Sequence, residues 1–198
     1  MLIDILRLGL SSNCERRIIH DHDYERIAKI ATQLHELEIK IALTSGSWDL
    51  FHVGHGRYLE KAKEMVCDGE RRGLLIVGVD SDEKIRQRKG KGRPIVPEGE
   101  RLEMLAHIRS VDLIFSKNLN DPPQALIKAV KPNVLVVSND SHYSAEQLED
   151  LRRLLQQNQG SLVILKRQAE TTTSGRLRGL MLQERERIAK AILEGGSL

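Results

Sequence analysis

Short apolar runs alternate with stretches of helical spacing along most of this chain, and that alternation restricts the fold more than any other feature. Five runs have the length and flanks of buried strands, at residues 41–43, 74–79, 111–115, 134–137 and 162–165. Helices are expected at about 21–38, 55–65, 100–109, 123–130, 143–157 and 174–193. Strands that alternate with helices form parallel sheets with right-handed crossovers. The sequence therefore predicts an α/β fold with a Rossmann-like, doubly wound, parallel five-stranded sheet.

The joint between the first strand and its helix carries the densest set of chemically active side chains. His52 and His55 stand where a loop becomes a helix, with Gly54 between them. Free N–H groups in the first turn of a helix favour anions, and histidines three residues apart share one face there. Gly54 carries no side chain that would keep a ligand away. This joint is therefore predicted to bind phosphate; two histidines that make only local hydrogen bonds are the alternative.

The same residues carry a resemblance to a known family. Thr44 to His55 follow the pattern T-x-G-x-[FW]-D-x-x-H-x-G-H, which resembles the signature of the HxGH nucleotidyltransferases in the cytidylyltransferase-like superfamily. A bare HxGH is a short motif, but here Gly46, Trp48 and Asp49 are in step with it. The resemblance runs from about residue 40 to residue 180. It is nearest to heptose 1-phosphate adenylyltransferase and glycerol-3-phosphate cytidylyltransferase.

The resemblance implies a role for each residue of this motif. As catalytic residues, His52 and His55 would donate hydrogen bonds in the region of the α-phosphate. Asp49 is expected to contact the substrate. Nucleotide contacts are expected from Ser45, Gly46, Ser47, Trp48 and Gly54.

A basic segment follows the second predicted strand. Residues 86–93, which we call the lid, hold five cations in eight positions together with Gly90 and Gly92. Blocks of this kind are usually solvated loops, and a nucleic-acid patch is another alternative, but no aromatic residue is interleaved for stacking. The lid follows the carboxyl end of a strand, and this position favours a third interpretation, in which the lid brings its cations onto the phosphates of a substrate. Gly90 and Gly92 would let the lid backbone approach these phosphates closely.

In the family that this chain resembles, the basic lid residues touch the triphosphate and the phosphorylated acceptor. The lysines expected to be catalytic are Lys89 and Lys91, and the expected nucleotide contact is Arg88. Asp80 directly follows the second strand, at the edge where open α/β sheets bind ligands, and is expected to contact the substrate. Lys117, in the predicted loop after the third strand, occupies the region where relatives hold the acceptor phosphate. Arg101 is expected to pair with a neighbouring acid or with another subunit.

Two later segments complete the resemblance. Residues 167–174 resemble the family's R-x-x-G-x-S-T-T, with Glu170 in place of the glycine. An N-cap explains one hydroxyl at a helix start, whereas a run of them suggests a grip on β- and γ-phosphates. At 138–143 relatives have a glycine-rich turn with an acid and an aromatic residue. This chain keeps an acid and an aromatic residue there, but it lacks the glycines. The residues expected from these segments are Arg167, Thr172, Thr173, Ser174 and Asp140 for the nucleotide and Tyr143 for the substrate.

The resemblance implies transfer of a nucleotidyl group from a nucleoside triphosphate to a phosphorylated small molecule, such as a sugar phosphate, with release of pyrophosphate. ATP is favoured because residues 92–97 look most like the heptose 1-phosphate branch. Mg²⁺ is expected as cofactor, held mainly by substrate phosphates, with no protein metal site. The alternatives are a CTP-dependent enzyme for glycerol or ethanolamine phosphate and a non-catalytic nucleotide-binding module. A class I aminoacyl-tRNA synthetase shares an HxGH-type motif, but this chain has no KMSKS-like segment.

The bulk properties add expectations about organisation and compartment. In a chain of 198 residues we expect a helical extension at 1–38 packed on the core, a nucleotidyltransferase domain at 39–193 and a tail at 194–198. A net charge of +3 does not call for nucleic acid, and no apolar run is long enough to span a membrane. Cys14 and Cys67 show no metal-binding spacing. A cytoplasmic homodimer or larger homo-oligomer without nucleic-acid or membrane partners is expected.

Overall fold

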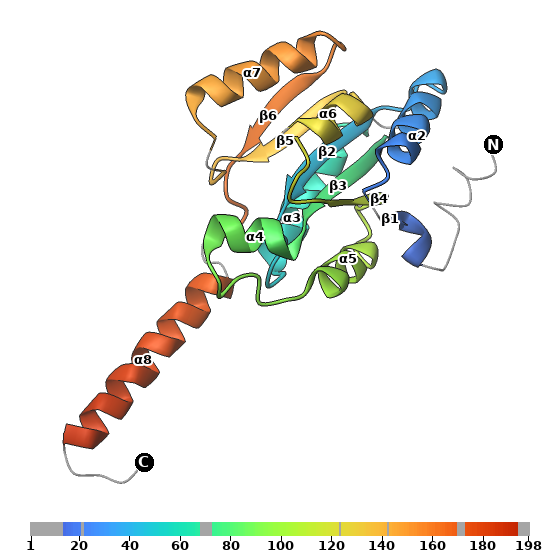
Figure 1. The fold of residues 1–198 in the computed structure, drawn as a ribbon. Helices are drawn as coiled ribbons and strands as arrows, with labels where there is room; N and C mark the ends of the chain where they lie inside the picture. Colours follow the sequence, from blue (N-terminus) through green and yellow to red (C-terminus); the bar gives the residue numbers. More distant parts are fainter. Residues whose placement is uncertain are drawn as a thin grey trace.

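The computed structural model describes residues 14–20, 22–67, 73–122, 124–141, 143–169 and 173–193. Its centre is a six-stranded sheet in the order β1-β4-β3-β2-β5-β6, with every neighbouring pair parallel (Figure 1). The predicted α/β, Rossmann-like fold is confirmed, with one strand more than the five expected. The additional strand, β1 (Ile18–Ile19), pairs with β4 (Leu113–Lys117) at one edge of the sheet.

The strand order reverses at β2 (Ile41–Gly46), and this reversal positions the site. On one side, β2 pairs along its whole length with β3 (Leu74–Asp80). On the other side, β2 pairs with β5 (Val134–Ser138) only at Ala42 and Leu43. The carboxyl ends of β2 and β5 therefore separate, which is where open α/β sheets bind ligands. The far edge of the sheet is β6 (Ser161–Leu165).

Helices cover both faces of the sheet. One face packs against α3 (Val53–Glu64) and α5 (Glu98–Ala106). The other face packs against α2 (Tyr24–Glu36), α6 (Ala125–Val130) and α7 (Ala145–Gln156). Side chains alternate between the two cores: Leu75 and Val77 of β3 lie on the α3 side and Ile76 on the α2 side. Because both faces are buried, the central strands read as continuous apolar runs in the sequence.

The lid begins as a helix rather than as a loop, which corrects the sequence-based expectation. Helix α4 (Asp82–Lys89) starts after Ser81, whose Oγ accepts a hydrogen bond from the Lys84 backbone N–H at 3.3 Å. Acidic residues in its first turn and basic residues in its last turn suit the helix dipole. Ile85 is the one buried side chain in α4, so the sequence contains no apolar repeat that would predict a helix.

Smaller differences concern the ends of elements. β4 ends at Lys117, so this lysine is the last residue of a strand and does not lie in the loop predicted after it. Asp23 caps α2, as one of two predicted candidates, because its Oδ1 accepts from the Arg26 backbone N–H at 2.8 Å. Residues 1–13 of the expected N-terminal extension lie outside the described residues.

The last helix, α8 (Thr173–Leu193), extends away from the sheet and its covering helices (Figure 1). Leu180, Met181 and Leu182 are exposed on it. Within the part of the chain that the structure describes, no helix has both the length and the apolar surface required to cross a membrane.

Candidate functional site

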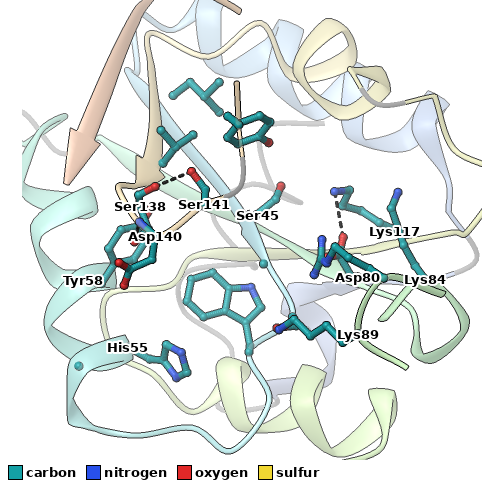
Figure 2. Close-up of a pocket in the computed structure, with 18 of the residues that line it drawn as sticks. Ser45, His55, Tyr58, Asp80, Lys84, Lys89, Lys117, Ser138, Asp140 and Ser141 are labelled. Atoms are coloured by element: carbon teal, nitrogen blue, oxygen red, sulfur yellow. Dashed lines mark hydrogen bonds and ion pairs between the residues drawn. The ribbon is translucent and has the colours of Figure 1, made fainter. Parts of the chain in front are cut away.

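A cavity of about 720 Å³ lies where β2 and β5 separate. Its volume falls within the roughly 300–1,000 Å³ that is usual for small-molecule pockets. Figure 2 shows His55 and Tyr58 of α3 on one side of this cavity and Asp80, Lys84 and Lys117 on the opposite side. The cavity therefore joins side chains from parts of the chain that are far apart in the sequence, at the carboxyl edge of the sheet.

Most residues that the sequence predicted for the site line this cavity. They are Ser45, Gly46, Ser47, Trp48, His52, Gly54, His55, Asp80, Arg88, Lys89, Lys117, Asp140, Tyr143 and Arg167. Asp49 and Lys91 do not line it. Thr172 lies outside the described residues, and the side chains of Thr173 and Ser174 are likewise not described.

The two histidines form a stacked pair. Their ring centroids are 4.0 Å apart, with an angle of 20° between the ring planes. His52 is the N-cap of α3, and its Nδ1 accepts a hydrogen bond from the Gly54 N–H at 3.0 Å. An imidazole nitrogen that accepts carries no proton, so His52 is neutral in this geometry and its proton is on Nε2. In this geometry His52 therefore carries its one ring N–H on Nε2.

His55 sits deeper and is held neutral by its surroundings. Burial first, and then electrostatic interactions with the His52 ring and with the Lys89 ammonium group, lower the pKa of His55 to about 4. Its Nδ1 is buried and has no hydrogen-bond partner among the described residues. Buried polar atoms are normally paired, so an unpaired one beside a cavity indicates a position completed by a ligand or water.

The first turn of α3 has one N–H group that already has a partner. The Gly54 N–H, one of the first-turn groups that the sequence suggested for anions, donates to His52 Nδ1. A side chain at Gly54 would lie 2.8 Å from the His52 ring and 2.9 Å from Ala169, so the glycine is also needed for packing.

The turn between β2 and α3 is held in a rare backbone conformation. Trp48 and Leu50 have φ values of 53° and 48°, in the left-handed region that few non-glycine residues adopt. Trp48 is buried, and its Nε1–H donates to the Gly78 carbonyl at 3.0 Å. Gly46 leaves room for the indole, because a Cβ there would lie 3.2 Å from the Trp48 ring. Tertiary contacts thus stabilise a turn that local preference disfavours.

Arg101 lies under this turn and connects three segments. Its side chain is fully buried, and its Nη1 donates to the carbonyls of Ser47 at 2.6 Å and Asp80 at 2.9 Å. Its Nε donates to the Val96 carbonyl at 3.0 Å, and its Nη2 contacts Asp82 at 2.7 Å. The prediction that Arg101 pairs with a neighbouring acid is therefore confirmed.

Asp49 faces the end of the lid instead of the cavity. Its carboxylate accepts from the backbone N–H groups of Ile95 and Val96, both at 3.0 Å, and pairs with Arg93 at 2.9 Å. Burial alone would raise the pKa of Asp49, but these hydrogen bonds and the Arg93 charge outweigh burial and lower it. Its position suits a residue that fixes the lid to the turn.

The lid cations differ in their partners. Lys89 Nζ donates to Ser47 Oγ at 2.9 Å, which places this lysine near the histidine pair. Burial, followed by the charges of Arg88 and Arg93, lowers the pKa of Lys89. Arg88 pairs with Asp80 at 3.0 Å. Among the described residues the Lys91 side chain, exposed at the tip of the lid, has no hydrogen bond or ion pair.

Tyr58 ties together the two strands that separate to form the cavity. Its hydroxyl donates to the Val136 carbonyl of β5 at 3.1 Å and lies 3.0 Å from the Thr44 hydroxyl of β2. Because the Tyr58 proton is used toward Val136, Thr44 donates to Tyr58. Sequence analysis assigned Tyr58 no role at the site.

The rim beside β5 is more open. Asp140 and Arg167 form an ion pair at 2.9 Å, with about half of each side chain exposed. Ser138 and Ser141 also line the cavity here. Other lining residues that sequence analysis did not assign are Lys84, Leu119, Asp121, Leu126, Ile127, Leu135, Val137, Gln168 and Ala169. Lys84 was detectable because residues 79–84, which end the second predicted strand and follow it, resemble the family. The apolar residues had the pattern of an ordinary hydrophobic core.

The donor set does not form a metal site of its own. Among the described residues, no three His, Cys, Asp or Glu side chains are grouped so as to hold a metal ion. Asp49 and Asp80 are both occupied by cations of the protein. A hard cation such as Mg²⁺ would therefore depend on oxygen atoms supplied by a bound ligand.

The sequence model of the cytidylyltransferase-like family matches residues 43–185. Bifunctional protein HldE from a Nitratiruptor species is 42% identical over 120 residues, or 60% of this chain and 24% of that protein. Bifunctional protein HldE from Helicobacter pylori (strain HPAG1) is 40% identical over 137 residues, or 67% of this chain and 28% of that protein. The chain thus spans about a quarter of the length of these curated relatives.

Solved structures share the fold. The lipopolysaccharide core biosynthesis protein from Thermoplasma volcanium GSS1 has a TM-score of 0.52 at 23% identity, covering 65% of this chain and 96% of that chain. Pantoate-beta-alanine ligase from Francisella tularensis has a TM-score of 0.55 at 14% identity, covering 79% of this chain and 68% of that chain. At these identities the likeness concerns the fold alone.

Proposed function

Because this chain belongs to the cytidylyltransferase-like family, we propose that it transfers a nucleotidyl group from a nucleoside triphosphate to a phosphorylated small molecule. One observation carries the proposal. Two stacked histidines from the start of α3 and Lys89 from the end of α4 lie at one end of a cavity at the carboxyl edge of the sheet. Neutral donors beside a flexible cation suit a reaction in which charge moves between phosphate groups.

The reaction needs no protein nucleophile. An oxygen of the acceptor phosphate, already ionised at neutral pH, attacks the α-phosphorus and forms a new P–O bond. The bond between the α-phosphorus and the oxygen that bridges to the β-phosphate breaks, and pyrophosphate leaves with the bonding electrons. Catalysis then consists of alignment and of stabilising the charge on the leaving group.

The protein groups divide this task. His52, with its proton on Nε2, and His55 would donate to oxygens around the α-phosphate. Lys89, whose ammonium group now contacts Ser47, would move onto the departing phosphates. Each well-placed donor to a developing negative charge contributes about 10²–10³ in rate.

Mg²⁺ is proposed as the cofactor on chemical grounds. When bound, it would neutralise phosphate charge through triphosphate oxygens, because the protein offers no group of carboxylates free for it among the described residues. The lid cations and the histidines would then act on the remaining charge.

For the nucleobase and the acceptor we favour ATP and a sugar phosphate. This rests on the resemblance of residues 92–97 to the heptose 1-phosphate adenylyltransferase branch and on the similarity to proteins named HldE. The exposed Asp140–Arg167 pair at the rim is the proposed base contact. CTP with an alcohol phosphate is the alternative. The division into an extension at 1–38 and a domain at 39–193, and assembly into homo-oligomers, stay predictions.

A pyrophosphate-release screen tests the proposal. The full chain is assayed with ATP, CTP, GTP and UTP against a panel of sugar and alcohol phosphates. We expect turnover with one preferred triphosphate, and we expect His52→Ala and His55→Ala each to lower kcat by about 10²–10³. Both variants should stay folded at the assay temperature, with a small fall in the unfolding midpoint for His52→Ala because this change removes the N-cap of α3. His107→Ala, on the exposed end of α5, is the control. Wild-type turnover in either cavity variant would overturn the assignment; triphosphate binding without any turnover would indicate a nucleotide-binding module instead.

A further inference from the structure

The half of the cavity opposite the histidines is a separate, positively charged compartment. Asp80 ends β3, Lys117 ends β4, and Lys84 projects from α4 beside them (Figure 2). Lys117 reaches Asp80 across Gly78, where a Cβ would lie only 3.0 Å from the lysine side chain. The topology thus directs two lysines to one end of the cavity. We call the residues Asp80, Lys84, Arg88, Lys117 and Tyr143 the acceptor compartment.

The single carboxylate inside the acceptor compartment is already neutralised. Asp80 is 3% exposed, and its oxygens lie 3.1 Å from Lys117 Nζ and 3.0 Å from Arg88 Nη2. Burial alone would raise the pKa of Asp80, but the charges of Lys117 and Arg88 outweigh burial and lower it. Asp80 therefore stays ionised and positions the two cations on either side of it.

Lys84 supplies positive charge beyond what Asp80 balances. Its Nζ donates to the Asn118 carbonyl at 3.3 Å and makes no ion pair among the described residues. Burial first, and then the charge of Lys117, lower the pKa of Lys84, and together they outweigh the opposing charges of Asp80 and Asp121. An anion placed beside Lys84 and Lys117 would relieve the repulsion between their ammonium groups.

The remaining acids along the cavity leave this excess in place. Among the described residues that line it, three acids, Asp80, Asp121 and Asp140, face five cations, Lys84, Arg88, Lys89, Lys117 and Arg167. Asp121 accepts from the Tyr24 hydroxyl at 2.7 Å and the Asn118 N–H at 2.6 Å, and Asp140 pairs with Arg167. The Asp121 charge acts on Lys84 without forming an ion pair among the described residues, and the cations still outnumber the acids by five to three.

A site for a quaternary or primary ammonium has a different composition. Such sites use uncompensated carboxylates or several aromatic faces around the cation. Among the described residues of the acceptor compartment Tyr143 is the one aromatic ring, and Leu126, Ile127 and Val137 also line the cavity. Tyr143 is 45% exposed, which leaves its ring available as a flat surface for a ligand.

We propose that the acceptor compartment binds a phosphate ester whose organic part is uncharged and rejects one that carries an ammonium group. The phosphate would lie against Lys84 and Lys117, with the organic part along Tyr143. The inference rests on the proposed function, and it assigns Lys84 as a substrate-binding residue and Asp80 as a positioning residue. Specificity here would come from repulsion of the wrong ligand as much as from attraction of the right one.

Two acceptors of similar size separate the possibilities. Glycerol 3-phosphate and phosphoethanolamine differ mainly in a hydroxylated versus an ammonium-bearing end. With the preferred triphosphate saturating, we expect kcat/KM for glycerol 3-phosphate to exceed that for phosphoethanolamine by about tenfold or more, because like charges at short range are strongly unfavourable. Calorimetric titration of each ester into the full chain with a non-hydrolysable triphosphate analogue measures the same preference without turnover.

The variant Lys84→Gln tests the assigned residue. We expect it to lower kcat/KM for glycerol 3-phosphate about tenfold, to narrow the preference over phosphoethanolamine, and to leave KM for the triphosphate within about twofold. Lys61→Gln, at an exposed position on α3 that does not line the cavity, is the matched control. If Lys84→Gln unfolds at a lower temperature than the wild type, Lys84→Met replaces it.

The outcomes distinguish failure of this inference from failure of the proposed function. Equal or better use and binding of phosphoethanolamine would overturn this inference and leave the proposed function standing. Absence of pyrophosphate release with every acceptor would overturn the proposed function, and the calorimetric preference would still decide the charge selectivity of the compartment. If Lys84→Gln behaves like Lys61→Gln in both assays, the assignment of Lys84 as a substrate-binding residue is wrong.

Discussion

The turn that lines the cavity and the tip of the lid, which lies outside the cavity lining, are held in opposite ways. The turn at 47–49 rests on Arg101, on the Trp48–Gly78 hydrogen bond and on the contacts of Asp49. At the tip of the lid, residues 90–92, a side chain added at Gly90 or Gly92 would meet nothing within 4 Å.

This difference shows which groups the fold prepares in advance. The histidine side of the cavity is positioned by buried polar contacts before any substrate arrives, as electrostatic preorganisation requires. The lid tip carries Lys91, whose side chain has no hydrogen bond or ion pair among the described residues, and Gly90, at φ 93°, gives the backbone a conformation that few other residues adopt. In the function proposed above, the turn would supply fixed geometry and the lid tip would supply charge that can follow a ligand.

Removing the Arg101 guanidinium, which supports the turn at 47–49, should have the largest effect on the free energy of unfolding. Arg101→Met would leave the Asp82 carboxylate and three carbonyls without their buried partner. Removing one member of a buried ion pair costs about 3–5 kcal/mol. We expect a loss of that size in the free energy of unfolding, measured by urea denaturation. Arg153→Met, at an exposed ion pair on α7, should change it by less than about 0.5 kcal/mol. A loss below about 1 kcal/mol for Arg101→Met would contradict the central role of this arginine.

Loosening the link between the turn and the lid should have a smaller and more local effect. Asp49→Asn removes the ion pair to Arg93 and presents an amide to the N–H groups of Ile95 and Val96. Hydrogen bonds to a charged group contribute about 1.5–3 kcal/mol, so exchange of these two amide protons should speed up by roughly 10- to 150-fold. Hydrogen exchange followed by mass spectrometry on the 93–97 peptide measures this. Asp150→Asn, on the exposed face of α7, is the control. Unchanged exchange at Ile95 and Val96 would show that Asp49 does not hold the lid.

Changing the free tip should have the smallest effect on the protein itself. Lys91→Ala should alter the free energy of unfolding by less than about 0.5 kcal/mol, because the side chain is exposed and unpaired among the described residues. We expect KM for the triphosphate to rise about fivefold, which corresponds to roughly 1 kcal/mol for an exposed charge contact. Lys29→Ala, exposed on α2, is the control for loss of one surface charge. If Lys91→Ala matches Lys29→Ala in KM, the tip is an ordinary surface loop.

The predictions that held depend on local patterns. The turn-to-helix joint was found from spacing alone, because His52, Gly54 and His55 must be close in space when they are close in sequence. The strands were found from apolar runs, because a parallel sheet buries both faces. The family assignment, which uses the same contiguous residues, is confirmed by the match over residues 43–185.

The expectations that changed depend on contacts between distant residues. α4 has one buried anchor, Ile85, and its helical state comes from capping by Ser81 and from packing. Asp49 was expected at the substrate because it belongs to the motif, yet its partners lie about 45 residues later, in the segment that follows the lid tip. Motif membership does not say which way a side chain points.

The sequence by itself determined the order of strands β2 to β6 and of the helices between them other than α4, the place of the turn-to-helix joint at His52 and His55, and the family. Each of these is written in short-range periodicity or in contiguous residues, where chain connectivity limits the possible geometry. Only the tertiary structure decided which charges meet. Lys84, Asp80 and Lys117 come from three elements, and Arg101 unites segments up to 54 residues apart. Ion pairs form between side chains that are close in space, so the order of Lys, Arg and Asp along the sequence is compatible with many different ion pairs. The folded sheet selects among them because it brings particular side chains together.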